Sequence, residues 1–156
     1  MNSNLHFSSK SNEWKTPKFL FDKLNEEFNF NLDAAASKDN ALCKNFFTLE
    51  DNSLIQDWQF GTVFCNPPYG REIGKFVKKG YEESLRGCTV VFLIPARTDT
   101  KWWHEYCSKG EVRFIKGRLK FKNGNCTNSA PFPSVIVIFN GKNGWGITKY
   151  VDFPKV

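Results

Sequence analysis

Hydrophobic positions in this chain occur in short continuous runs and in runs at helical spacing, and the two kinds alternate along its first two thirds. Residues 62–65 are a β-branched and aromatic run that stops at two prolines, and residues 88–94 are a longer apolar run that stops at Pro95. Both runs predict buried strands. Between them, one helical face is apolar: Ile73, Phe76, Val77, Tyr81 and Leu85. The order strand, helix, strand predicts a parallel sheet with right-handed crossovers, in which ligands bind at the carboxyl ends of the strands.

Order is expected to begin at Trp14. Residues 1–13 are polar and rich in Ser and Asn, which predicts a disordered tail ahead of a single domain at residues 14–156. Thr16 followed by Pro17 is typical of a helix start, with the hydroxyl as N-cap. An amphipathic helix is predicted from the apolar positions that follow: Leu20, Phe21, Leu24 and Phe28.

A further strand is predicted to end at Asp33, where a run of very small residues from Ala34 to Ser37 begins. Small residues at the end of a first strand allow the backbone to approach a ligand closely. A helix start after a strand is the alternative interpretation. In a parallel sheet, Asp33, Asn66 and Arg97 would all emerge at one edge.

The C-terminal third predicts strands that close the sheet. Residues 112–115 and 134–139 are apolar runs, and the second is followed by Asn140-Gly141, a favoured hairpin turn. Residues 145–151 are therefore expected to pair as a last strand. The predicted fold class is α/β, with a mostly parallel sheet closed by antiparallel C-terminal strands.

Composition favours a soluble protein with a polyanionic partner. The 156 residues are 40% hydrophobic and include 16 Phe and 5 Trp, which is enough for a substantial core. The formal net charge of +6 favours nucleic acid as a partner. Five cysteines without a Cys-x-x-Cys pair, and two histidines, do not form a zinc pattern, so no metal site is expected. Reduced thiols and the lack of an apolar run of membrane-spanning length predict a cytoplasmic protein.

The candidate chemistry lies in Asn66-Pro67-Pro68-Tyr69, directly after the strand at residues 62–65. The doubled proline removes two backbone donors and leaves carbonyl oxygens to face a ligand. The Asn66 side-chain oxygen and the Pro67 carbonyl would accept hydrogen bonds from the two N–H groups of a planar NH2 group such as that of adenine, while Tyr69 stacks on the ring. Two fixed acceptors let the nitrogen lone pair localise and attack an electrophile. A strand-ending turn with a packed tyrosine is the alternative interpretation.

These four residues resemble the catalytic motif of S-adenosylmethionine-dependent amino-methyltransferases, written Asp/Asn/Ser-Pro-Pro-Tyr/Phe/Trp. Residues 13–139 as a whole resemble the phage-type DNA N6-adenine methyltransferases of the Dam family. The resemblance depends on the joint order of Glu13-Trp14-x-Thr16-Pro17, Leu32-Asp33-Ala34-Ala35-Ala36, Asn66-Pro67-Pro68-Tyr69, the stretch from Pro95 to Trp103, Gly117-Arg118-x-Lys120-Phe121, and Pro131-Phe132-Pro133-Ser134. It implies a Rossmann-like S-adenosylmethionine-dependent methyltransferase fold, and methyl transfer to an adenine flipped out of double-stranded DNA. A phage-encoded enzyme of this kind would act in the host cytoplasm.

The resemblance also implies roles for residues at matching positions. Asn66, Pro67 and Tyr69 would be catalytic. The residues implied to bind S-adenosylmethionine are Trp14, Thr16, Asp33, Ala34, Glu50, Asp51 and Asn66. Independently of the resemblance, basic residues beside this edge fit contacts with phosphates. The candidate residues for DNA contact are Pro68, Arg71, Arg97, Lys101, Arg118 and Lys120. The chain departs from the family pattern after Asp33, where Ala34 to Ser37 stand in place of the usual glycines.

Two alternatives stay open. Methyltransferases of RNA adenine and of protein glutamine amide share the motif and act on the same planar NH2 group, although the charge of +6 favours nucleic acid over a protein amide. A non-catalytic nucleic-acid-binding domain of the same fold is supported by the altered turn after Asp33. The chain leaves no room for a separate target-recognition domain, so base reading is expected from loops such as residues 123–132.

Overall fold

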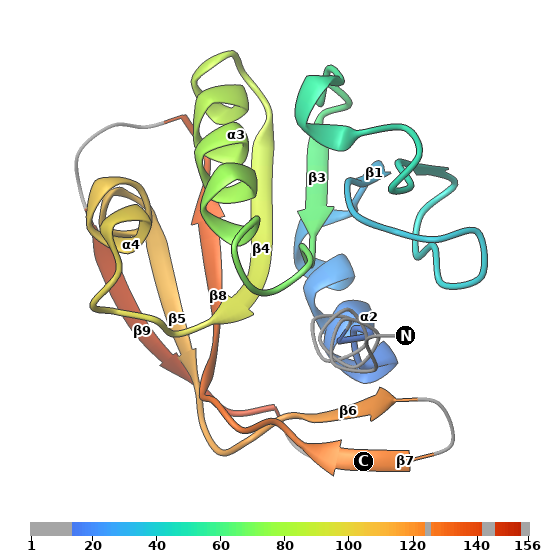
Figure 1. The fold of residues 1–156 in the computed structure, drawn as a ribbon. Helices are drawn as coiled ribbons and strands as arrows, with labels where there is room; N and C mark the ends of the chain where they lie inside the picture. Colours follow the sequence, from blue (N-terminus) through green and yellow to red (C-terminus); the bar gives the residue numbers. More distant parts are fainter. Residues whose placement is uncertain (1–13, 124–125, 142–145, 154–156) are drawn as a thin grey trace, which may run out of the picture.

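The computed structural model describes residues 14–123, 126–141 and 146–153 (Figure 1). The tail predicted at residues 1–13 therefore lies outside the described residues. Within the described ranges, the helical elements are α2 (Lys18–Phe28), α3 (Ile73–Leu85) and α4 (Lys101–Glu105), with the short 3-10 turns η1 (Ser53–Ile55) and η2 (Cys107–Lys109).

The main sheet has the strand order β2-β1-β3-β4-β8-β5-β9 (Figure 1). Its strands are β1 (Leu32–Asp33), β2 (Asn45–Phe46), β3 (Thr62–Cys65), β4 (Thr89–Pro95), β5 (Glu111–Ile115), β8 (Ser134–Phe139) and β9 (Ile147–Val151). β1 to β4 pair in parallel, whereas β8 is antiparallel to both of its neighbours. A separate hairpin joins β6 (Lys120–Asn123) and β7 (Cys126–Ser129). The predicted α/β class with a mostly parallel sheet fits this arrangement.

The last strand does not pair as predicted. The hairpin expected at Asn140-Gly141 is wrong, because β9 pairs with β5 rather than with β8, and in parallel, from Glu111↔Ile147 to Ile115↔Val151. β8 already lies between β4 and β5 and has no free side. The returning chain therefore joins the open edge of β5, and the sheet ends in a parallel strand.

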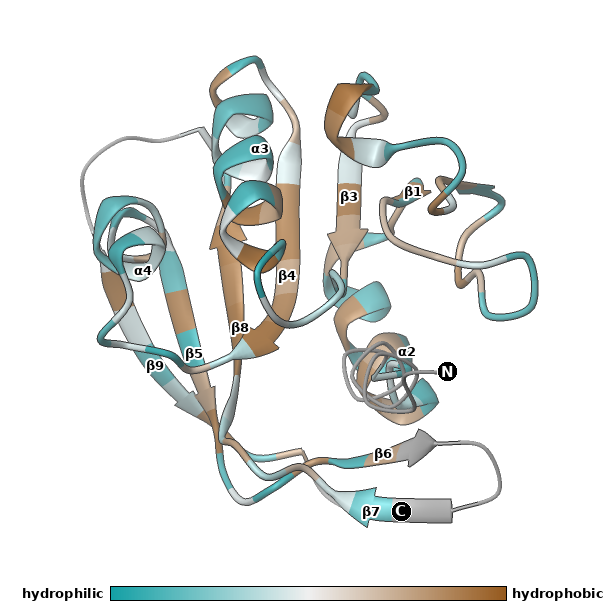
Figure 2. Cartoon of the chain, viewed as in Figure 1, coloured by the Kyte–Doolittle hydropathy of each residue, from teal (hydrophilic) through white to brown (hydrophobic). Residues whose placement is uncertain are grey.

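Alternate side chains of the central strands fill two cores, one on each face of the sheet. On β4, Val90, Phe92 and Ile94 pack in the cluster that includes α3, while Val91 and Leu93 pack in the cluster that includes α2. Figure 2 shows these strands as hydrophobic bands, with α3 turning a hydrophilic face outward. Burial on both sides explains why the sequence of β4 is apolar without alternation.

The start of α2 differs from the prediction in the role of Thr16. The helix begins at Lys18 with Pro17 as its N-cap residue, and no side chain caps it. The Thr16 hydroxyl contacts Asn66 instead. The helix itself is as predicted, since Leu20, Phe21 and Leu24 are buried and pack against the sheet. The segment before α2 is therefore tied to the end of β3 by a side-chain hydrogen bond.

Candidate active site at the carboxyl edge of the sheet

Parallel pairing brings the predicted site residues to one edge of the sheet. Asp33 ends β1 and pairs with Phe64 of β3, Asn66 directly follows β3, and Arg97 follows β4. The arrowheads of β3 and β4 point to this edge in Figure 1. Strand ends, rather than long loops, therefore position the candidate residues, as expected for an open α/β sheet.

The Asn66 amide has its nitrogen bound and its oxygen unpaired. Nδ2 donates to the Trp14 carbonyl oxygen at 2.5 Å and to Thr16 Oγ1 at 3.0 Å. Oδ1 is buried and has no hydrogen-bond partner among the described residues. Leaving a buried acceptor unpaired costs about 1–3 kcal/mol, so such a group in a native site needs an explanation. A ligand that donates a hydrogen bond to Oδ1 would supply that explanation.

Tyr69 is held under the end of β4. Its hydroxyl donates to the Leu93 carbonyl oxygen at 3.1 Å, and its ring meets Phe132 edge-on with centroids 5.5 Å apart. The residue is only 3% exposed, and burial raises the pKa of the phenol well above its usual value, which keeps the hydroxyl protonated. Phe132 in turn meets Trp14 edge-on at 5.4 Å. Aromatic side chains from distant segments thus cover the loop that carries Asn66.

The two prolines of the motif are enclosed to different degrees. Pro67 is buried and Pro68 is half-buried, while Gly70 beyond them is exposed with φ of 115°. A positive φ favours glycine, which lets the chain turn sharply between the motif and α3. The turn fixes where the loop leaves the sheet edge.

Asp33 is buried at the end of β1 and turned towards its own loop. Its carboxylate accepts hydrogen bonds from the backbone amides of Ala35 at 3.3 Å and Leu42 at 3.2 Å. Burial raises the pKa of this carboxyl to about 6, because desolvation outweighs the two amide hydrogen bonds. Ala34 is fully buried, and its amide donates to the Phe64 carbonyl oxygen at 2.9 Å. Asp33 and Ala34 therefore organise the loop after β1.

The two acidic residues beyond β2 differ in their surroundings. Asp51 accepts from the Thr48 backbone amide at 2.7 Å and from the Thr48 hydroxyl at 3.0 Å, and these hydrogen bonds lower the pKa of its carboxyl. It closes a local turn. Glu50 is exposed beside it. The structure places both residues after a strand that is parallel to β1, on the side of the sheet edge where Asp33 lies.

The candidate DNA-contacting cations are exposed and follow strands that end at this edge. Lys101 pairs with Glu105 at 3.6 Å, and Arg118 donates to the Ala130 carbonyl oxygen at 3.3 Å. The exposed cations of this group are Arg71, Arg97, Lys101, Arg118 and Lys120. β4 and β5 are both antiparallel to β8, which lies between them, and so they run in the same direction. The segments that follow β4 and β5 therefore begin at the same edge of the sheet.

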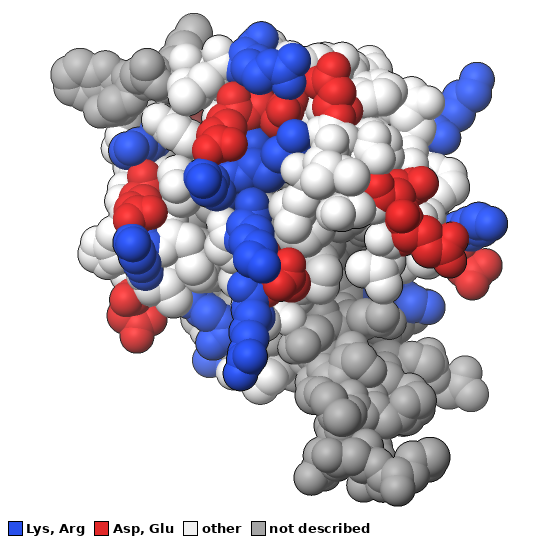
Figure 3. All heavy atoms as spheres, turned by 45° about the horizontal axis from the view of Figure 1, so that its top comes forward, with Lys and Arg blue, Asp and Glu red and all other residues white. Residues whose placement is uncertain are grey.

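The outer face of α3 carries both positive and negative side chains, unlike the group of exposed cations beyond the strand ends. Figure 3 shows Lys and Arg interleaved with Asp and Glu on the face that comes forward when the top of Figure 1 is tilted towards the viewer. Along α3, Lys75 pairs with Glu72 at 3.3 Å, and Lys79 pairs with the buried Glu83 at 3.1 Å. The positive charges of this helix thus have carboxylates beside them.

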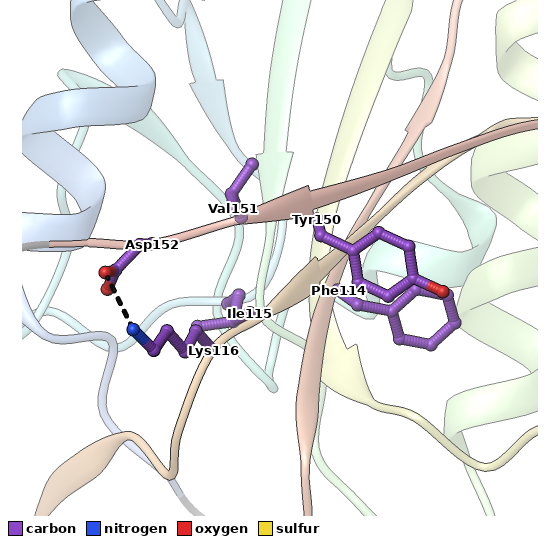
Figure 4. A pocket seen from close by; sticks show the side chains of 6 residues that line it. All are labelled: Phe114, Ile115, Lys116, Tyr150, Val151 and Asp152. Atoms are coloured by element: carbon purple, nitrogen blue, oxygen red, sulfur yellow. Dashed lines mark ion pairs between the residues drawn. The ribbon is translucent and has the colours of Figure 1, made fainter.

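A surface hollow of about 620 Å³ lies beside the ends of β5 and β9 (Figure 4). Phe114 and Tyr150 stack on one side of it, with centroids 5.6 Å apart, and Lys116 pairs with Asp152 at 3.6 Å on the other. None of its lining residues was predicted as a site residue, and it shares no residue with the loop around Asn66. The hollow is therefore a separate surface feature.

Two further features of the described residues bear on function. No cluster of His, Cys, Asp and Glu suited to a metal ion occurs among them. No helix that the structure describes is both long enough and apolar enough to cross a membrane.

Sequence reasoning missed the partners of Asn66. Trp14 and Thr16 precede it by about 50 residues, and the motif itself gives no sign of this contact. Phe132 belongs to a Pro-Phe-Pro segment whose contact with Tyr69 was likewise not predicted. The available signal was only the order of short segments along the chain.

Comparison with known proteins identifies the family. The model of the family "DNA N-6-adenine-methyltransferase (Dam)" matches residues 2–154. The chain is 34% identical over 145 residues to the DNA N-6-adenine-methyltransferase of Haemophilus phage HP1, a match that covers 87% of this chain and 83% of that protein. It is 30% identical over 145 residues to the protein of the same name from Escherichia phage T1, which covers 76% of this chain and 60% of that protein. The chain therefore belongs to the DNA N-6-adenine-methyltransferase (Dam) family.

Proposed function

We propose that this protein is a DNA adenine-N6 methyltransferase, which transfers the methyl group of S-adenosylmethionine to the exocyclic amino group of adenine. One observation carries the proposal within the structure: the Asn66 amide has both protons bound and a buried, unpaired oxygen. An oxygen of this kind suits a donor such as an aromatic amino group. Family membership makes adenine the donor to test first.

The chemistry needs two fixed acceptors. Asn66 Oδ1 and the Pro67 carbonyl would each accept one hydrogen bond from the amino group, so that its nitrogen lone pair is less delocalised into the ring and more nucleophilic. Once the methyl group is bonded to the nitrogen, one of its two protons is released to solvent. A preorganised acceptor in a dry site contributes about 3 kcal/mol to the stability of the transition state. Tyr69 would stack on the base. Because the amino group lies inside the duplex, the adenine would be flipped out into the site.

S-adenosylmethionine supplies the methyl group from its sulfonium when bound. We place it at the same sheet edge, in a Rossmann-like arrangement, beside the loop that Asp33 organises. The small side chains after Asp33 support this placement, because they allow a close approach of the backbone. Of the two acids after β2, Glu50 is the better ribose ligand, since the Asp51 carboxylate is bound to Thr48.

DNA would lie along the carboxyl edge of the sheet. The exposed cations beyond β3, β4 and β5, among them Arg71, Arg97 and Arg118, would contact phosphates. The mixed charges along α3 make that face a poorer surface for a polyanion. The base would therefore enter from the edge where Asn66 lies.

The test is transfer of a labelled methyl group from S-adenosylmethionine to unmethylated duplex DNA, followed by digestion to nucleosides. We expect label in N6-methyladenine, and a loss of about 100-fold or more in kcat for Asn66→Ala with cofactor binding retained. Asn45→Ala is the matched control: this asparagine on β2 is exposed and donates to the Asn31 carbonyl oxygen. Its activity should be retained.

Three results would contradict the proposal. Undiminished activity of a folded Asn66→Ala variant would remove Asn66 from the chemistry. Absence of label in DNA despite cofactor binding would redirect the search to RNA adenine or a protein glutamine amide. Absence of cofactor binding would instead indicate a non-catalytic domain.

A further inference from the structure

We propose that Thr16, together with the backbone carbonyl of Trp14, is a positioning residue that fixes the orientation of the Asn66 amide. The inference rests on the proposed function and deepens it, because it assigns Thr16 a role in the methyl-transfer step through Asn66. In this role Thr16 contacts the side chain of Asn66, and Asn66 contacts the acceptor amino group.

The geometry of the amide carries the argument. An asparagine amide has two N–H donors and one oxygen, and its two ends differ only in hydrogen bonding. Both donors of Asn66 are used, one by the Trp14 carbonyl oxygen at 2.5 Å and one by Thr16 Oγ1 at 3.0 Å. A rotation of 180° would place Oδ1 against the Trp14 carbonyl, acceptor against acceptor. The two contacts therefore leave Oδ1 as the end that faces a substrate.

The surroundings of Thr16 support a role outside the helix. Thr16 lies one residue before Pro17, the N-cap residue of α2, and no side chain caps this helix. Its hydroxyl instead reaches a residue 50 positions away in the chain. Burial of Asn66 Oδ1 means that solvent does not compete to set the orientation of the amide.

Three proteins test this role: the wild-type protein, Thr16→Val and Thr16→Ser. Valine keeps the branched shape of threonine and removes the hydroxyl, whereas serine keeps the hydroxyl. We expect Thr16→Val to lower kcat at saturating S-adenosylmethionine by about tenfold, the equivalent of one hydrogen bond. The Kd of the cofactor should change less than about twofold, and Thr16→Ser should restore most of kcat.

The split between kcat and cofactor affinity separates positioning from cofactor binding. An unchanged kcat in Thr16→Val would overturn the positioning role. So would a loss of activity that saturating cofactor restores, because Thr16 would then be a cofactor ligand. Absence of methyl transfer by the wild-type protein would overturn the proposed function and this role with it.

A double-mutant cycle on thermal unfolding tests the contact without any need for activity. Thr16→Val should lower the Tm of the wild-type protein by more than it lowers the Tm of Asn66→Ala, in which the partner amide is already absent. Equal shifts in the two backgrounds would show that Thr16 and Asn66 do not interact, and would overturn the inference. If Thr16→Val fails to fold, Thr16→Ala, which also removes the hydroxyl, replaces it in the cycle, with the same expected difference between the two backgrounds.

Discussion

At the scale of single residues, the site combines a local motif with distant partners. Asn66, Pro67 and Tyr69 lie within four consecutive residues, so the chemistry proposed for them depends on a motif that can be read directly from the sequence. The contacts that orient Asn66 come from residues about 50 positions earlier, and the residue that covers Tyr69 comes from the segment before β8. Contacts of this kind depend on tertiary packing and have no periodicity or motif that would reveal them.

The raised pKa of Asp33 predicts a measurable pH dependence of stability. Its carboxyl has a pKa near 3.8 in the unfolded chain and about 6 in the folded protein, so the folded state binds more protons between these values. The free energy of unfolding should therefore fall as the pH rises from about 4 to about 6, by at most ~3 kcal/mol, and this contribution should be constant above that window.

Asp33→Asn provides the control for this prediction, because its amide does not titrate. The difference in unfolding free energy between the wild-type protein and Asp33→Asn, measured by urea denaturation, should decrease across the window as the pH rises. A difference that stays constant would show that the carboxyl of Asp33 titrates alike in both states.

At the scale of elements, strands buried on both faces and helices with one apolar face were predicted, whereas β2, the strand β7 within the loop expected at residues 123–132, and the partner of β9 were not. β3, β4, β8 and α3 have the expected patterns because burial selects their side chains. β2 is only two residues long and too short for a pattern. β9 is largely exposed, and its partner was decided by which strand had a free edge rather than by its own sequence.

The close packing of α3 on β4 predicts that alanine at position 80, within a helix, lowers the stability of the protein. Gly80 is buried, and a Cβ there would lie 2.3 Å from the ring of the fully buried Phe92. Although alanine favours helices by about 1 kcal/mol over glycine, overpacking typically costs about 1–3 kcal/mol. We expect Gly80→Ala to lower the free energy of unfolding, as measured by chemical denaturation.

Gly74→Ala is the matched substitution in the same helix. A Cβ at Gly74 would lie 2.9 Å from the indole of Trp102, a longer approach than at Gly80 and to a ring that is half-buried rather than fully buried. Its stability should therefore change less than that of Gly80→Ala. Equal stability of the two variants would mean that α3 is free to move away from the sheet.

At the scale of the whole molecule, the net charge of +6 indicated a polyanionic partner but not where it binds. The fold supports a location at the edge carrying Asn66 for the proposed DNA contact, since exposed cations follow several strands that end there. The sequence predicted this edge because the parallel order of strands was readable. It did not predict that the lysines of α3 have acidic partners, which depends on side-chain placement.

Arg97→Ala with Arg118→Ala should weaken DNA binding and flatten its salt dependence. Each phosphate contact removed should reduce the slope of log K against log salt by about 0.9. Lys78→Ala is the control, because Lys78 is an exposed cation on the outer face of α3, 3.7 Å from Glu82. DNA binding is measured by fluorescence anisotropy at several salt concentrations. The slope of log K against log salt should be the same for Lys78→Ala as for the wild-type protein. An unchanged slope in the double variant would show that DNA binds elsewhere on the protein.

The aromatic cover over the Asn66 loop has a practical consequence for kinetics. Trp14 meets both Phe121 and Phe132 edge-on at 5.4 Å, and Phe132 meets Tyr69. We expect a base that enters past these rings to displace part of this cover, and so to change the environment of the Trp14 indole. The fluorescence of that indole, isolated by subtracting the signal of a Trp14→Phe variant, would therefore report the entry of the base into the site. It times the arrival of the base separately from the transfer of the methyl group.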